Sequence, residues 1–355
     1  MAGSSFGRIF HISTFGESHG KAVGVVVQGC PPGIEMNERI IQKALDRRKP
    51  GAGPSSTSRQ EPDIPEIMSG CFKGVTTGTP IMILIRNRDA DSRAYEKNAA
   101  VFRPGHGDFS YQAKYGIRDW RGGGRASARE TAARVAAGAV AAAFLDLYNI
   151  EITTCTMALG GIYADHFDPV CAGNSWLECP DPEAQKKIEK KISQVKAEGD
   201  SLGGIVQITA RNVPGGIGDP VFEKLDADIA GALMGIGAVK AVEIGSGCRA
   251  ALMTGFENND QITEIGFETN HSGGILAGIS NGDDIVAKVH VKPIPSILKE
   301  QKTIDENKNE TVISTKGRHD VSAIPRINPV CRAMTALVLA DHILRQRAVK
   351  ENRHP

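Results

Sequence analysis

The chain has 355 residues with 42 basic and 41 acidic side chains, a length that suits one large domain or two ordinary ones. The net charge of +1 argues against a general nucleic-acid binder, which usually carries a basic surplus over a whole face. The first residues contain no basic segment followed by an apolar one, and no apolar run reaches the ~18 residues of a membrane-spanning helix, so we expect a cytoplasmic protein without nucleic-acid or membrane partners.

The cysteines give no sign of a crosslinked or metal-stabilised fold. There are seven of them, an odd number, and they are widely spaced without a CxxC pair. The sequence therefore indicates neither a disulfide framework nor a metal site. Most of the cysteines are expected to be small buried hydrophobic residues.

The first fifty residues predict two short strands and a helix. One strand begins at Phe6, a GESHG turn covers residues 16–20, and a second strand covers residues 22–27. A helix is predicted over residues 37–48. His19 lies in the glycine-flanked turn, where a side chain is expected to be exposed. A lone histidine is more often structural than catalytic, so His19 needs support from elsewhere in the chain.

A loop rich in Pro, Gly and Ser follows over residues 47–63 and carries several basic side chains (Arg47, Arg48, Lys49 and Arg59). It is either a surface loop or a basic lid that becomes ordered on an anionic ligand. Strands are predicted at residues 72–75 and 81–85, before a charged segment at residues 86–97.

Residues 103–134 form the segment richest in chemically active groups. It contains His106 between two glycines, a triple glycine at residues 122–124, and seven basic residues against three acidic ones. Ser127 and Glu130 have the spacing of a capping box at the start of a helix over residues 128–148. A glycine-rich loop before a helix suits a phosphate or carboxylate. The alternative is an alanine-rich packing helix whose glycines only make a turn.

The second half of the chain repeats the pattern of the first. A shift of 183 residues places the GESHG turn on GDSLG at residues 199–203, and GVTTGTPIMILI resembles GISNGDDIVAKV. A long apolar helix is predicted in each half, the second over residues 328–345. The pattern indicates an α+β fold with an internal pseudo-twofold duplication, with halves at about residues 6–150 and 199–346 that share one core.

Two features stand out against this repeat. Residues 163–198, with a charged helix at 182–197, are predicted to be a peripheral insert. His19 corresponds to Leu202 in the second half, so the turn does not require a histidine. This difference favours a functional role for His19.

Seven motifs in a fixed order resemble the chorismate synthase family over nearly the whole chain. They are FGESHG (residues 15–20), DRRKPG (46–51), RPGHGD (103–108), WRGGGRASARET (120–131), NHSGGILAGISNG (270–282), KPIPS (292–296) and TKGRHD (315–320). The resemblance implies a lyase that converts 5-enolpyruvylshikimate 3-phosphate to chorismate and phosphate by a 1,4-anti elimination with reduced FMN. It also implies a single domain over residues 1–355, a β-α-β sandwich with helices between antiparallel sheets, and a homotetramer.

The resemblance also implies roles for individual residues. His19 would protonate the departing phosphate, His106 would protonate the reduced flavin, and Asp320 would accept a proton at the flavin. Substrate contacts would come from Arg48, Arg129, Arg59 and Ser18. FMN contacts would come from Arg125, Ala126, Ser127, Gly237, Ala238, Ala277, Lys292, Pro293, Ile294, Pro295, Ser296 and Arg318. NADPH would enter only as a reductant.

The chain departs from the family pattern at three of its positions, which are Pro54, Ala277 and Pro295. A rival interpretation is a flavin- or nucleotide-binding protein without lyase activity. No GxGxxG motif follows a predicted strand, so a Rossmann-type nicotinamide site is not supported. An RNA-binding module is disfavoured by the neutral charge and the scarcity of aromatic residues.

Overall fold

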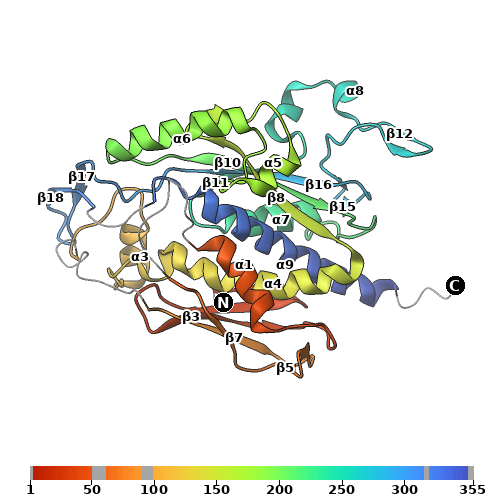
Figure 1. The fold of residues 1–355 in the computed structure, drawn as a ribbon, viewed down its shortest axis with the longest axis horizontal. Helices are drawn as coiled ribbons and strands as arrows, with labels where there is room; N and C mark the ends of the chain where they lie inside the picture. The colour runs from red at the N-terminus through yellow and green to blue at the C-terminus, as the bar shows by residue number, and fades with distance from the viewer. Residues whose placement is uncertain (1–2, 50–60, 89–98, 316–319, 351–355) are drawn as a thin grey trace.

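The computed structural model describes residues 3–49, 61–88, 99–315 and 320–350. Two five-stranded sheets enclose a layer of long helices (Figure 1). The strands pair antiparallel in both sheets. This arrangement confirms the predicted α+β sandwich with its helical layer between antiparallel sheets.

The first sheet comes from the N-terminal part of the chain. Its order is β1 (Ser5–Phe6), β2 (His11–Gly16), β3 (Ala22–Gln28), β7 (Ile81–Arg86) and β4 (Pro65–Ile67). Alternate residues of β7 are buried, as expected for a strand with one face on a core. The strands predicted at residues 22–27 and 81–85 are confirmed.

The strand predicted at residues 72–75 is wrong. The structure has two short strands there, β5 (Cys71–Phe72) and β6 (Val75–Thr76), which pair with each other. The chain reverses between them at Lys73 and Gly74, and both have a positive φ. A glycine in a short apolar run marked a hairpin turn rather than a strand interior.

The second sheet has the order β11 (Val239–Ile244), β16 (Ile285–Val291), β10 (Gly204–Arg211), β8 (Glu151–Leu159) and β9 (Ile162–Tyr163). The 183-residue shift places β3 on β10. In the first sheet β3 pairs with β7, and in the second sheet β10 pairs with β16. These paired positions support the predicted division into two halves, which stays a prediction.

The helical layer contains α1 (Glu38–Arg48), α4 (Thr131–Leu145), α7 (Leu225–Met234) and α9 (Ile324–Lys350). The Asn37 side chain accepts from the backbone N–H groups of Arg39 and Ile40 and so starts α1 where the sequence predicted it. The apolar segments 128–148 and 324–349 are long enough to span a membrane, but 67% and 94% of their apolar windows are buried within the protein.

The predicted capping box at the start of α4 is wrong. The Ser127 hydroxyl accepts from the backbone of Arg129, at the start of a 3-10 turn over Ala128–Glu130. The Glu130 carboxylate accepts from Arg134 Nε at 3.0 Å instead of turning back to Ser127. The predicted helix is therefore a 3-10 turn, then α4, then a second 3-10 turn over Asp146–Tyr148.

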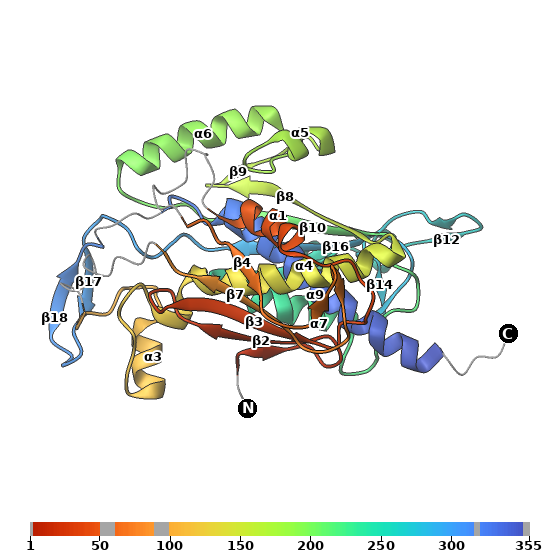
Figure 2. The same ribbon diagram turned by 60° about the horizontal axis from the view of Figure 1, so that its bottom comes forward.

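The remaining elements lie outside these three layers. Helices α5 (Pro169–Asn174) and α6 (Pro182–Ala197) cover the outer side of the second sheet (Figures 1 and 2). The other elements are short and are α3 (Asp108–Tyr115), α8 (Gly255–Asn258), β12 (Ile262–Thr263), β13 (Gly266–Phe267), β14 (Ile275–Leu276), β15 (Ile279–Ser280), β17 (Gln301–Ile304), β18 (Glu310–Ile313) and the 3-10 turns Gly124–Ala126 and Gly247–Leu252. Elements α3 and β17 mark one end of the sandwich, and β14 and β15 lie toward the other (Figures 1 and 2).

Candidate active site

The triple glycine brings the two predicted catalytic histidines to one loop. Gly122 and Gly123 have φ angles of +62° and +89°, which disfavour any residue with a Cβ. A Cβ on Gly122 would lie 2.5 Å from the Nε2 atom of His19, and a Cβ on Gly123 would lie 3.0 Å from the Nε2 atom of His106. The two imidazoles therefore pack against adjacent glycines.

His19 lies in the turn between β2 and β3, as predicted. Its neighbour Ser18 is almost completely buried, and the Ser18 hydroxyl donates to the carbonyl of Arg121 at 3.4 Å. This bond joins the turn to the residue before the triple glycine. Ser18 thus holds the two loops together, and its predicted contact with substrate stays a prediction.

His106 is held by an ion pair beneath it. Its Nδ1 atom lies 3.0 Å from Asp108 Oδ1 and 3.1 Å from Arg103 Nη2. Burial raises the pKa of Asp108, but hydrogen bonds from Arg103 and His106 outweigh this and hold that pKa well below its usual range. Asp108 accepts from a protonated Nδ1, whereas Arg103 donates only to an unprotonated Nδ1, so the two neighbours favour different tautomers. The Nε2 atom faces Gly123.

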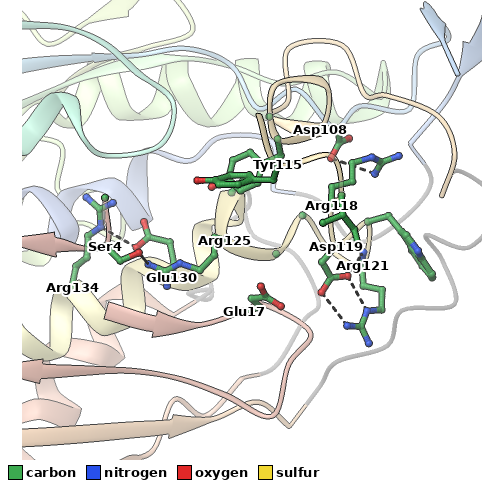
Figure 3. Close-up of a pocket in the computed structure, with 18 residues that line it drawn as sticks. Ser4, Glu17, Asp108, Tyr115, Arg118, Asp119, Arg121, Arg125, Glu130 and Arg134 are labelled. Carbon is green, nitrogen blue, oxygen red and sulfur yellow. Dashed lines mark hydrogen bonds and ion pairs between the residues drawn. The ribbon is translucent and has the colours of Figure 1, made fainter. Parts of the chain in front are cut away.

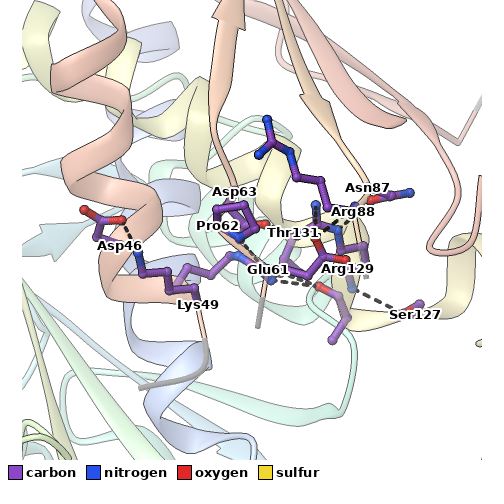
Figure 4. Close-up of polar contacts among 12 residues, drawn as sticks. Asp46, Lys49, Glu61, Pro62, Asp63, Asn87, Arg88, Ser127, Arg129 and Thr131 are labelled. Carbon is purple, nitrogen blue, oxygen red and sulfur yellow. Dashed lines mark hydrogen bonds and ion pairs between the residues drawn. The ribbon is translucent and has the colours of Figure 1, made fainter. Parts of the chain in front are cut away.

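The predicted substrate ligands Arg48 and Arg129 lie together on either side of Asp63. Arg48 Nη2 donates to Asp63 Oδ2 at 2.6 Å, and Arg129 Nη1 donates to the other oxygen. All three residues are buried. Burial raises the pKa of Asp63, but the two guanidinium groups outweigh it and leave that pKa lowered. Glu61 lies 3.9 Å from Arg129 Nη2 (Figure 4).

Several predicted FMN residues lie beside the RPGHGD loop. The Lys292 ammonium donates to the carbonyl of Gly105, and the Lys292 backbone N–H donates to Ala238 at 2.9 Å. A Cβ on Gly105 would lie 3.3 Å from Pro295. Burial and the charge of Lys240 lower the pKa of Lys292. Residues 292–296 and 237–238 are therefore close to His106.

Asp320 lies near the KPIPS segment, and the turn that contains Leu202 connects the two. Its carboxylate pairs with Arg326 Nη2 at 2.8 Å. The next residue, Val321, accepts from the Leu202 backbone at 2.7 Å, and the Ser201 hydroxyl donates to the carbonyl of Ile294. Asp320 is thus near the KPIPS segment. Pro54, Arg59 and Arg318 lie outside the described residues.

A cavity of about 980 Å³ opens beside the triple-glycine loop and is lined in part by Gly123 and Gly124 (Figure 3). Arg125 and Ala126 line it, together with Tyr111, Tyr115 and Arg134. The Arg125 guanidinium donates to Thr14 Oγ1 at 2.7 Å and to the carbonyl of Gly16 at 3.1 Å. Arg125 therefore ties the loop to β2. The cavity is large enough for a cofactor.

Comparisons with known proteins place the whole chain in one family. The sequence model of the chorismate synthase family matches residues 10–344. The chain belongs to the chorismate synthase family. A chorismate synthase from Desulfosudis oleivorans is 59% identical over 354 residues, which are 99% of this chain and 100% of that protein. One from Desulfatibacillum aliphaticivorans is 56% identical, over 99% of this chain and 98% of that protein. A chorismate synthase crystal structure at 33% identity has a TM-score of 0.77 and covers 96% of this chain and 93% of that chain.

The family membership confirms the predicted function. Chorismate synthases are lyases that convert 5-enolpyruvylshikimate 3-phosphate to chorismate and phosphate in the shikimate pathway, and the family uses reduced FMN. The chain is therefore a lyase of this pathway.

One predicted FMN residue of the family pattern lies apart from the rest. Ala277 is in the turn between β14 and β15, and the next residue, Gly278, packs against Lys224 at the start of α7. Ala238 follows the other end of α7, and ten helical residues span about 15 Å. This chain by itself thus does not bring Ala277 to Ala238 and Lys292.

The sequence missed two residues of the site. Asp63 is the buried partner of both predicted substrate arginines, and Asn87 accepts from Arg129 Nε at 2.9 Å. Asp63 ends the basic loop, and its neighbours in sequence give no signal for its contacts, whereas Asn87 directly follows β7. A polar residue directly after a buried strand is the one feature that points to Asn87.

Proposed function

We propose that His19 and His106 serve as two separate proton donors, arranged by the triple-glycine loop, in the conversion of 5-enolpyruvylshikimate 3-phosphate to chorismate. The contact of both Nε2 atoms with adjacent glycines carries this proposal. His19 gives a proton to the departing phosphate oxygen. Imidazole suits this step because its unperturbed pKa is about 6.5.

The substrate anions are proposed to bind near Arg48 and Arg129. The substrate has two carboxylates and a phosphate, whereas the whole chain has a net charge of only +1. The cations must therefore be gathered at one place, and arginine forks match carboxylate and phosphate oxygens. Asp63 fixes both guanidinium groups before substrate arrives. Arg59 and Ser18 complete the proposed substrate set.

Reduced FMN is proposed to bind between the RPGHGD loop and the KPIPS segment. The donor set fits an anionic phosphate, because Lys292 brings an ammonium group to Gly105 and Gly237 has open space around it. When bound, the flavin would supply electrons to an elimination that is redox-neutral overall. His106 holds a proton at Nε2, and Asp320 is the proposed proton acceptor on the opposite segment. NADPH is proposed only as a reductant.

A homotetramer in the cytoplasm is proposed, without nucleic-acid or membrane partners. The separation of Ala277 from the other FMN residues supports assembly, because a second copy could bring its Ala277 to the site. Light scattering checks the assembly, and four times the 37.8 kDa of one chain is the expected mass.

An anaerobic assay tests the function. Purified protein is mixed with dithionite-reduced FMN and substrate, and chorismate and phosphate are followed together. We expect equal amounts of the two products. The assay is repeated with NADPH and oxidised FMN. Flavin reduction without release of phosphate in either assay would support the rival flavin reductase and reject the lyase.

A further inference from the structure

Asn87 uses its whole side-chain amide to connect two parts of the site. Its Nδ2 atom donates to the carbonyl of Glu17 at 2.9 Å and to the carbonyl of Gly20 at 2.8 Å. Its Oδ1 atom accepts from Arg129 Nε at 2.9 Å. The side chain lies next to Arg129 in Figure 4.

The two carbonyls that Asn87 binds lie on either side of His19. The backbone N–H of Asn87 also donates to Lys21 at 3.1 Å, so the bonds run from the start of the turn to its end. On its other side, the His19 ring packs against Gly122. Asn87 and Gly122 therefore hold the turn between them.

We propose that Asn87 is a positioning residue that fixes His19 relative to Arg129, a proposal that rests on the proposed role of His19. An amide suits this place because its NH2 group donates two hydrogen bonds to the turn, while its oxygen accepts one from Arg129. A carboxylate could accept from Arg129 but could not donate to the two carbonyls. Asn87 thus sets the distance between the proton donor and the arginine that holds the substrate.

Asn87→Asp is the informative variant because it keeps the shape and the acceptor for Arg129 but loses both donors to the turn. We expect its turnover number to fall roughly 10- to 100-fold, the effect of misplacing a catalytic group by about 1 Å. The matched control is Asn212→Asp, since Asn212 also donates to a backbone carbonyl, that of Asn149. The control should keep its turnover within about twofold.

A double-mutant cycle separates positioning from a purely structural role. In a His19→Ala background, Asn87→Asp should change the residual turnover by less than about threefold, because the group that it positions is gone. Melting curves give the folded fraction of each variant, and Asn87→Ala takes the same place in the cycle if Asn87→Asp does not fold. Equal losses with and without His19, or wild-type turnover in Asn87→Asp, would overturn the proposal. Wild-type turnover in His19→Ala would instead reject the proposed role of His19.

Discussion

The Nδ1 atom of His106 is tied to the Asp108 carboxylate at 3.0 Å, whereas His19 lies in a turn whose carbonyls are tied by Asn87. A carboxylate beside an imidazole fixes the orientation of the ring. In the proposed mechanism, His106 gives a proton to the flavin from this fixed ring. His19, whose turn is held by Asn87, is the proposed proton donor to the departing phosphate.

If the two histidines and Asp320 act on different protons, each should be needed on its own. His19→Ala and His106→Ala should each lower turnover by roughly one to four orders of magnitude. Asp320→Asn should also slow catalysis, because an amide keeps the shape but cannot accept a proton. Melting temperature, FMN affinity and turnover with reduced flavin are measured on all three. Wild-type turnover in folded, flavin-binding histidine variants would remove both histidines from the mechanism.

Asp63 neutralises two buried guanidinium groups, and its replacement should be costly. Asp63→Asn removes the carboxylate that pairs with Arg48 and leaves Arg129 only the more distant Glu61 at 3.9 Å, so the free energy of unfolding at pH 7 should fall by about 3–5 kcal/mol. Asn tolerates the positive φ of 49° at this position. Urea unfolding measures the loss, and Asp168→Asn is the control because Asn is an equally good N-cap on an exposed helix.

The pH dependence gives a second test of Asp63. Its pKa is lowered by folding, so its stabilisation is present above the unfolded value of about 3.9 and is lost as the pH falls through the folded pKa. The wild type should therefore lose stability below about pH 4 more steeply than Asp63→Asn. If the free energy of unfolding fell equally with decreasing pH in the two proteins, this would contradict the pairing of Asp63 with the arginines.

Local sequence predicted the residues whose signal is a motif and missed those whose role comes from distant contacts. His19 lies in a turn bounded by Gly16 and Gly20, and His106 lies between Gly105 and Gly107, which is a local signal. The expected exposure of His19 is wrong, because its side chain is only partly exposed. Asp63 meets Arg129 across 66 residues, and Asn87 meets Gly20 across 67. A single sequence does not specify such pairs, because the sheet and helices must form before they meet.

At the scale of elements, the triple-glycine loop is the part that positions the two histidines. A Cβ on Gly122 would lie 2.3 Å from His19 Cδ2 and 2.9 Å from Ser18 Oγ. Gly122→Ala should therefore displace His19 and lower turnover by about 10²-fold. Gly33→Ala is the control, since Gly33 also has a positive φ but open space around it. Both changes should cost about 1–2 kcal/mol of backbone strain, and equal turnover in the two would reject the packing argument.

The sequence predicted an element and its bounds well where the hydrophobic pattern and the capping residue both lie within the element or next to it. Helix α6 begins after Asp181, whose side chain accepts from the backbone of Glu183 and Ala184, and it covers the predicted residues 182–197. Helix α4 begins later than predicted, at Thr131, because residues 128–130 form a 3-10 turn. The Glu130 carboxylate binds Arg134 instead of Ser127, and spacing alone does not reveal this choice of partner.

At the scale of the whole molecule, the two sheets are joined through the contact of α4 with α9. Both helices are buried over most of their length, although the last turns of α9 are exposed, and Gly138 of α4 lies directly against Ala333 of α9. The site loops lie at the end of the sandwich marked by α3 (Figures 1 and 2). The contact of Gly138 with Ala333 therefore sets how closely the two helices approach.

Gly138→Ala tests that packing because two effects of known size oppose each other. Alanine favours a helix over glycine by about 0.8–1 kcal/mol, but its Cβ would lie 2.3 Å from the Cβ of Ala333 and 2.6 Å from its Cα. Backbone cannot yield as a flexible side chain does, so overpacking of about 1–3 kcal/mol should win. We expect a net loss of stability in urea unfolding. Gly231→Ala in α7, where no atom lies within 4 Å of the added Cβ, should instead gain up to about 1 kcal/mol. Equal gains in both variants would show that α4 and α9 separate without cost.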